Sequence, residues 1–250
     1  MKAVILAAGR GSRMKGLTDE KPKCLNELLG RPLFDWQQES LREAGITDIV
    51  VGRGYRKELL TGDFQTADND RWDQTNMVYT LLCAAPYLRA DTCVVSYADI
   101  VYHPDHVRAL MAAAGDVVIT YDTLWRPLWE LRFPDPLADA ETLRIDERGI
   151  IQEIGQKAAS LEEIQGQYMG LLKFTPQGWG QVEELLNQMP PADLDRLDMT
   201  SLLQKVIRRG IPINTVGVKG RWCEIDSETD LDVCTKHANT DQWEHDWRWE

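Results

Sequence analysis

The sequence lacks long hydrophobic runs and paired cysteines. No window approaches the ~18 consecutive apolar residues that a membrane-spanning helix needs. The apolar start at residues 1–6 is too short for the hydrophobic region of a secretion signal, and Arg10 and Arg13 follow it. The five cysteines are odd in number and form no Cys-x-x-Cys pair, which argues against a zinc or redox motif. We therefore expect a cytoplasmic protein without a membrane partner.

Positive charge is also scarce. The chain has 28 Lys and Arg against 40 Asp and Glu, so its formal net charge is −12 and a nucleic-acid partner is not expected. The first 23 residues are the exception, because they hold six basic residues and only two acids. A local cationic patch on an acidic protein suits a small anion better than a polyanion. The alternative is a terminus that is basic by chance.

Apolar runs and helical spacing alternate along the first half of the chain. The pattern predicts strands at residues 2–7, 49–51, 92–96 and 116–121, with helices at 33–44, 77–85 and 104–113 between them. Such alternation is typical of an α/β fold with a doubly wound, mostly parallel central sheet. The apolar content of 43% is ample for its core.

The second half follows a different pattern. A hairpin is predicted at 142–154, further strands at 168–174 and 213–216, and helices at 176–187, 201–209 and from Ser227 to about 236. Three prolines and two tryptophans at 124–140 predict a structured loop or lid. We expect one domain over 1–236, with a lid and acceptor side at about 122–174, and an acidic Trp-rich tail at 237–250. The tail would dock on the body, join a partner in a homodimer, or fray.

The loop after the first predicted strand combines glycine with positive charge. Met14 stands where a dinucleotide-binding G-x-G-x-x-G motif needs glycine, and Leu17 stands where a Walker A motif needs lysine. Glycine still lets backbone N–H groups turn toward phosphate oxygens, which a nearby arginine neutralises. Because the loop follows the first strand of a parallel sheet, we expect it at the carboxyl edge, where such folds bind ligands.

The run Leu6-Ala7-Ala8-Gly9-Arg10-Gly11-Ser12-Arg13, followed by Lys21-Pro22-Lys23, resembles the signature of the sugar-phosphate nucleotidyltransferases (nucleoside-diphosphate-sugar pyrophosphorylases). The resemblance extends from residue 1 to about 236 and implies a Rossmann-like nucleotidyltransferase fold. It implies that residues 6–13 bind the nucleotide, that Arg13 holds its phosphates, and that Lys23 meets the phosphate of the attacking substrate. An arginine fork suits several phosphate oxygens, whereas lysine supplies a point charge on a flexible stem.

The resemblance also implies a magnesium site. Asp99 follows a buried strand at the expected carboxyl edge, where the family places its first metal aspartate, which also borders the nucleotide. Asp226 lies in Glu224-Ile225-Asp226-Ser227, similar to a stretch found late in cytidylyltransferases, and we favour it over Glu224 as the second ligand. Magnesium takes one or two carboxylates and completes its shell with phosphates and waters. His103-x-x-His106 is not favoured as a zinc site, because no third ligand is evident.

Nucleotide and acceptor preferences rest on further resemblances. The segment opened by Asn76 resembles one in small cytidylyltransferases that act on phosphocholine and phosphonates. Asn76 would read the base, or cap a helix, or do both. The stretch with Tyr168 and Gly170 resembles the acceptor side of the same branch. Trp129 and Arg132 in the proposed lid are further acceptor candidates, through an aromatic face or an arginine fork.

These implied roles describe a magnesium-dependent cytidylyltransferase that moves CMP from CTP to a small acceptor and releases pyrophosphate. Phosphocholine, a phosphonate and an acyl phosphate such as phosphoglutamine stay open as acceptors. One alternative is a sugar-1-phosphate uridylyl- or guanylyltransferase. Another is a nucleotide-sensing subunit without catalysis, but such relatives typically lose residues that are present here, namely Arg13, Lys23, Asp99 and Asp226.

Overall fold

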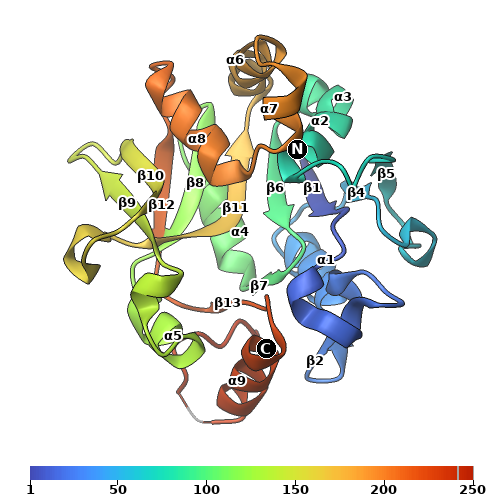
Figure 1. Ribbon diagram of the computed structural model, residues 1–250, viewed down its shortest axis with the longest axis vertical. Coiled ribbons are helices and arrows are strands. Elements are labelled where there is room, and N and C mark those ends of the chain that lie inside the picture. Colours follow the sequence, from blue (N-terminus) through green and yellow to red (C-terminus); the bar gives the residue numbers. More distant parts are fainter. Residues whose placement is uncertain (241, 250) are drawn as a thin grey trace.

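The computed structural model describes residues 1–240 and 242–249, and a seven-stranded sheet forms its centre (Figure 1). The strand order is β12-β8-β11-β6-β1-β4-β5. In chain order the strands are β1 (Lys2–Ala7), β4 (Ile49–Arg53), β5 (Gln65–Asp68), β6 (Cys93–Tyr97), β8 (Val117–Asp122), β11 (Gln167–Phe174) and β12 (Asn214–Val218). Neighbours run parallel, except that β11 is antiparallel to both β6 and β8. The predicted α/β class with a mostly parallel sheet is confirmed.

Helices cover both faces of this sheet. One face packs against α2 (Met77–Cys83), α3 (Ala85–Ala90), α6 (Pro176–Asn187) and α8 (Met199–Arg208), and the other against α1 (Leu33–Glu43), α4 (Pro104–Ala112) and α5 (Trp125–Arg132). The central strand β1 packs against both helical layers. Val4 and Leu6 belong to the hydrophobic core on the first face, and Ala3 and Ile5 belong to the core on the second face. Successive side chains of a strand point to opposite faces, so a strand between two helical layers is apolar throughout.

Shorter elements lie around the central sheet. The predicted hairpin is present as β9 (Glu141–Ile145) and β10 (Ile151–Lys157), and a second small pair is β2 (Glu27–Leu28) with β3 (Arg31–Pro32). The remaining short pieces are α7 (Pro191–Asp195) and the 3₁₀ turns η1 (Ser12–Thr18), η2 (Lys23–Leu25), η3 (Lys57–Leu59), η4 (Pro136–Ala138) and η5 (Leu161–Glu163). Within the described ranges no helix is long and apolar enough to cross a bilayer.

A short antiparallel ladder joins two distant parts of the chain. Strand β13 (Trp222–Glu224) pairs with β7 (Ile100–Tyr102). The pairing continues beyond the strands, because the N–H of Ile225 donates to the carbonyl of Asp99 at 2.8 Å. Two segments about 125 positions apart in the sequence therefore lie side by side at the carboxyl edge of β6.

The prediction that 124–140 forms a loop without a regular element is wrong for its first half, while its role as a lid stays a prediction. Residues 125–132 form α5, which is followed by the turn η4. Pro127 lies in the first turn of this helix, where a backbone N–H has no intrahelical partner and its loss costs little. Pro134 and Pro136 come after the helix ends. One proline therefore lies in the first turn of α5 and the other two lie beyond its end, so none of the three breaks the helix.

The C-terminal segment docks on the body of the same chain. Helix α9 (Glu228–Ala238) begins with the predicted capping box between Ser227 and Asp230. Beyond it, Trp247 is fully buried, and the His245 imidazole contacts the buried Asp122 carboxylate at 3.0 Å. Of the outcomes expected for the tail, docking on the body is the one observed in its described part.

Replacement of Trp247 by alanine tests this docking. Loss of a fully buried tryptophan leaves a cavity, so Trp247→Ala should lower the free energy of unfolding by about 3–5 kcal/mol. The half-buried Trp249 serves as the control, and Trp249→Ala should cost less than half as much. Urea denaturation measures both variants. A Trp247→Ala protein within about 0.5 kcal/mol of the wild type would show that the tail does not contribute to the core.

Candidate active site

A cavity of about 270 Å³ opens at the carboxyl ends of β1 and β6. Its wall combines the loop after β1, the start of α2 and the residues that follow β6. The residues predicted from the sequence that line it are Leu6, Ala7, Ala8, Gly9, Gly11, Ser12, Arg13, Lys23, Asn76, Asp99 and Asp226. Segments from five parts of the chain therefore meet where the sequence predicts a nucleotide.

Arg10 is the one member of the predicted loop that lies outside this cavity. Its guanidinium donates to the Asp19 carboxylate at 2.6 Å on the protein surface. Arg13, three positions later, keeps a 71% exposed side chain at the cavity wall and forms an ion pair with Asp226. Of the two arginines, Arg13 therefore faces the cavity and Arg10 lies on the surface.

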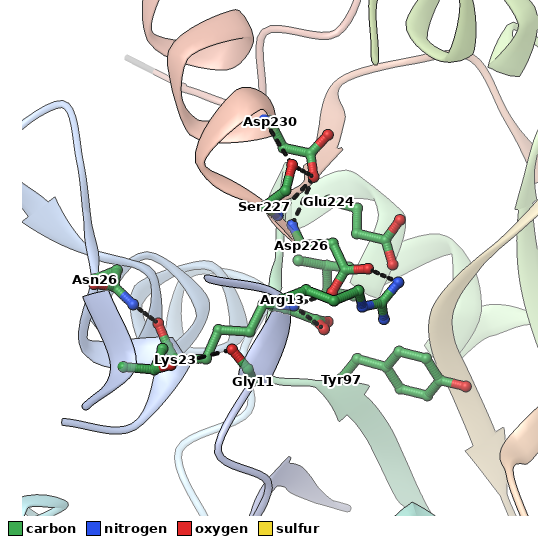
Figure 2. Close-up of polar contacts among 12 residues, drawn as sticks. Gly11, Arg13, Lys23, Asn26, Tyr97, Glu224, Asp226, Ser227 and Asp230 are labelled. Atoms are coloured by element: carbon green, nitrogen blue, oxygen red, sulfur yellow. Dashed lines mark hydrogen bonds and ion pairs between the residues drawn. The ribbon is translucent and has the colours of Figure 1, made fainter. Parts of the chain in front are cut away.

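Glycine is required in the loop because the Lys23 side chain passes directly over it. Gly11 has φ +74°, and a Cβ added there would lie 2.7 Å from both Cβ and Cδ of Lys23. The side chain of Asn26 donates to the Lys23 carbonyl at 2.9 Å and fixes the turn from the other side (Figure 2). Gly11 and Asn26 together hold the lysine stem against the loop.

Gly11→Ala should therefore disturb the site without unfolding the protein. The added methyl group must displace Lys23, and displacements near 1 Å can lower kcat/KM about 100-fold. Gly16→Ala is the matched control, because a Cβ there meets no described atom within 4 Å. Turnover and thermal melting of both variants are the measurements. Equal turnover in the two variants would contradict the steric role of Gly11.

Asp99 and Asp226 share one cation in this structure. The ammonium of Lys23 contacts the Asp99 carboxylate at 2.8 Å and also pairs with Asp226, while Arg13 pairs with the other Asp226 oxygen (Figure 2). Burial opposes the charge on Lys23, but the two carboxylates outweigh it and raise the pKa of Lys23 above its ordinary value. The two aspartates predicted as metal ligands are therefore close enough to hold a single positive charge between them.

The donor set fits magnesium. Asp99 Oδ1 is buried and, among the described residues, finds no hydrogen-bond partner, so one carboxylate oxygen stays available to a ligand. No group of three or more potential metal-binding side chains occurs in the described ranges. Two carboxylates are nevertheless what Mg²⁺ commonly takes from a protein when phosphates and waters complete its shell. Asp99 and Asp226 would hold such an ion, and their role as metal ligands stays a prediction.

Glu224 lies beside these two aspartates and differs from them. Burial, together with the negative charges of Asp99 and Asp226, raises its pKa to about 7, although Arg132 opposes the shift. The Arg132 guanidinium pairs with Glu224 at 2.8 Å, so this carboxylate is already engaged. Asp226 pairs with the cations that line the cavity, whereas Glu224 pairs with the buried Arg132, and the preference for Asp226 as a ligand stays a prediction.

Asn76 caps α2 and also borders the cavity. Its side-chain oxygen accepts from the Met77 N–H at 2.7 Å, and its amide nitrogen donates to the Arg196 carbonyl at 3.3 Å. The helix-capping alternative is thus confirmed. Because both side-chain groups have protein partners, reading of a base by Asn76 requires at least one of these contacts to be exchanged, and the role remains a prediction.

A second cavity of about 160 Å³ adjoins the first. Arg13, Tyr97 and Asp226 line both cavities, so the shared wall is the place where two bound molecules would meet. Tyr168 lines the second cavity and packs edge-on against Tyr97, with ring centroids 5.8 Å apart. Gly170 lies behind the Tyr97 ring, since a Cβ at position 170 would come within 2.6 Å of that ring. The predicted acceptor stretch therefore shapes the second cavity, through Tyr168 directly and through Gly170 indirectly.

The two acceptor candidates in α5 have different outcomes. Trp129 borders the second cavity but is almost fully buried, and its indole N–H donates to Asp139 at 3.1 Å. Arg132 does not face the cavity, because its 1% exposed side chain is enclosed by Glu224 and Asp230. The prediction that Arg132 binds the acceptor is corrected here, because its buried guanidinium pairs with Glu224 through Nη2 and with Asp230 through Nε.

Several residues that line the two cavities were not predicted from the sequence. Tyr97 ends β6 two positions before Asp99. Its place at the carboxyl end of a predicted parallel strand could have indicated that it borders the site. Glu141 begins the hairpin strand β9 and lines the second cavity, while Trp72 lines the first. Trp72 lies in an irregular segment whose position no sequence periodicity indicates. His103 caps α4, where its Nδ1 atom accepts from the Asp105 N–H at 3.1 Å.

Comparison with known proteins identifies the family. The sequence pattern of the family described as "MobA-like NTP transferase domain" matches residues 3–159, which is more than half of the chain. The chain belongs to this family. A CTP:phosphoglutamine cytidylyltransferase from Campylobacter jejuni is 38% identical, over 93% of this chain and 98% of its own length. The nucleotidyltransferase resemblance carried by residues 6–13 and 21–23 is thereby confirmed.

Solved structures share the fold of this MobA-like NTP transferase. The inositol-1-phosphate CTP transferase from T. maritima aligns with a TM-score of 0.71 at 20% identity, covering 95% of this chain and 96% of its own. The CTP:phosphocholine cytidylyltransferase from Streptococcus pneumoniae aligns with a TM-score of 0.68 at 22% identity, covering 94% and 97%. At these identities the alignments establish the common architecture.

Proposed function

We propose that this NTP transferase is a cytidylyltransferase that moves CMP from CTP to a small phosphorylated acceptor and releases pyrophosphate. The observation that carries the proposal is the wall shared by the two cavities, where Arg13 and Asp226 lie beside Lys23 and Asp99. A nucleotide in the larger cavity and an acceptor in the smaller one would approach each other at this wall. The extensive identity to the Campylobacter jejuni relative supports CTP as the donor and makes phosphoglutamine the first acceptor to test.

The reaction is an in-line displacement between two anions. A phosphoryl oxygen of the acceptor attacks the α-phosphorus of CTP, a new P–O bond forms, and the bond to pyrophosphate breaks. The backbone of residues 9–12 and the Arg13 guanidinium hold the triphosphate, while Lys23 orients the acceptor phosphate from its place beside Asp226. Positioning and charge stabilisation supply most of the rate, so no protein nucleophile is needed.

Magnesium completes the proposed site. Held by Asp99 and Asp226, the ion would offset the negative charge that accumulates where the two substrates meet. Lys23 and Arg13 pair with the same carboxylates in this structure, so these side chains are free to turn toward phosphates once the carboxylates have another cation. Lys23 and Arg13 together balance the two acids at the wall, and the ion would supply the further positive charge that offsets part of the substrate charge.

Replacement of the two aspartates tests the site. Asp99→Asn and Asp226→Asn keep the shape of each side chain but remove its charge, so each should lower kcat at least about 100-fold, because one charge at such a site supplies several kcal/mol. Asp193→Asn on the exposed side of α7 is the control and should retain activity. Pyrophosphate release with Mg²⁺ is the measurement, with four nucleoside triphosphates against phosphoglutamine, phosphocholine, a phosphonate and sugar 1-phosphates.

Specific outcomes would contradict the proposal. Wild-type turnover in either aspartate variant would remove that residue from the site. Faster reaction of UTP or GTP with a sugar 1-phosphate would replace the cytidylyltransferase assignment with the sugar-nucleotide alternative. Nucleotide binding without turnover on any acceptor would favour a sensing role.

A further inference from the structure

Arg132 lies behind the proposed metal ligand Asp226 and contacts it through a chain of buried groups. The Arg132 Nε atom donates to Asp230 Oδ1 at 2.7 Å. The other oxygen of Asp230 accepts from the backbone N–H of Asp226 at 3.0 Å and from that of Ser227 at 2.8 Å (Figure 2). One carboxylate therefore links the guanidinium to the backbone of the residue whose side chain faces the cavities.

The same guanidinium also holds the adjacent strand. Its Nη2 atom pairs with Glu224 at 2.8 Å, two positions before Asp226. The guanidinium lies 5.0 Å from the ring centroids of both Trp129 and Phe133, so its own position in α5 is fixed by aromatic contacts. Arg132 thus clamps the end of β13 and the start of α9, which flank Asp226 on either side.

The charges in this clamp are strongly stabilised. Burial opposes ionisation of Arg132, but Glu224 and Asp230 outweigh it and raise the pKa of the guanidinium. Burial likewise opposes the charge of Asp230, and Arg132 reverses the effect and lowers the pKa of that carboxyl. With side chains only 1% and 4% exposed, respectively, neither group is free to bind substrate. Substrate contact therefore does not explain the arrangement of Arg132 and Asp230.

We propose that Arg132 and Asp230 are positioning residues that hold Asp226 in the orientation required to bind the metal. The inference rests on the proposed magnesium site at Asp99 and Asp226. Groups that orient metal ligands through hydrogen bonds typically change metal affinity about 10- to 100-fold when they are removed. A flexible Asp226 would still reach the cavities, but it would no longer share one cation with Asp99 at fixed geometry.

Two conservative variants test this role. Arg132→Lys keeps the charge but cannot bridge two acids, and Asp230→Asn keeps the shape but replaces one carboxylate oxygen by an amide. Calorimetry would measure the Kd of CTP in EDTA and the Kd of the Mn²⁺·CTP complex for each protein. We define the Mn²⁺·CTP advantage as the Kd of CTP divided by the Kd of Mn²⁺·CTP. We expect this ratio to fall about 10-fold or more in both variants, with the Kd of CTP alone changed less than about twofold.

Ser227→Ala is the matched control. It removes the hydroxyl that caps α9 but leaves the contact from Asp230 to the Asp226 N–H in place. This variant should lose thermal stability, as should Asp230→Asn, because both weaken the helix cap. It also removes the hydroxyl that donates to Asp230 Oδ2, but the Mn²⁺·CTP advantage should stay within about twofold because Asp230 still pairs with Arg132 and the Asp226 N–H. If Arg132→Lys does not fold, Asp230→Asn alone tests the positioning role, since this substitution replaces a single oxygen atom of the clamp.

The outcomes separate this inference from the proposed function. An unchanged Mn²⁺·CTP advantage in the folded Asp230→Asn protein would overturn the positioning role, as would an equal loss in Ser227→Ala. Asp99→Asn reports on the metal site itself. If that variant also keeps the full advantage, the proposed magnesium site is wrong, independently of Arg132.

Discussion

The backbone hydrogen bond from the Ile225 N–H to the Asp99 carbonyl sets the geometry on which the chemistry depends. It extends the ladder between β7 and β13 and brings together two aspartates that the sequence separates by 127 positions. Antiparallel pairing fixes register to the residue, so the carboxylates meet at one defined point of the sheet edge. A one-residue slip of β13 would turn Asp226 away from Asp99.

Charge balance follows from this pairing. Two carboxylates forced together in a partly buried site repel each other unless cations offset them, and Lys23 and Arg13 do so here. Arg132 performs the same task one layer deeper for Glu224 and Asp230. In front, the Arg13 side chain is 71% exposed and Lys23 lines the first cavity, whereas the side chain of Arg132 behind them is 1% exposed. In the proposed assignment, this layering separates the groups that bind ligands from the group that orients them.

The sequence predicted local features better than long-range ones. The buried strand β1, the glycine loop and the capping box of α9 depend on neighbouring residues, and all three were predicted. The β7–β13 ladder was not, because three-residue strands leave no periodic signal and their pairing depends on the whole sheet. Helix α5 was misjudged because proline in a first helical turn looks the same in sequence as proline in a loop. Arg132 was assigned to the acceptor because its two buried partners lie about 95 positions away.

The proposed chemistry requires that Asp99 and Asp226 jointly hold one divalent cation at the wall between the two cavities. Crystals of the protein grown with Mn²⁺ and CTP would test this directly through the anomalous scattering of manganese. We expect one manganese peak in contact with both carboxylates and with CTP phosphate oxygens, and Lys23 moved from its place between the two acids. A peak that touches neither aspartate, with Lys23 still bridging them, would show that the two aspartates do not form the metal site.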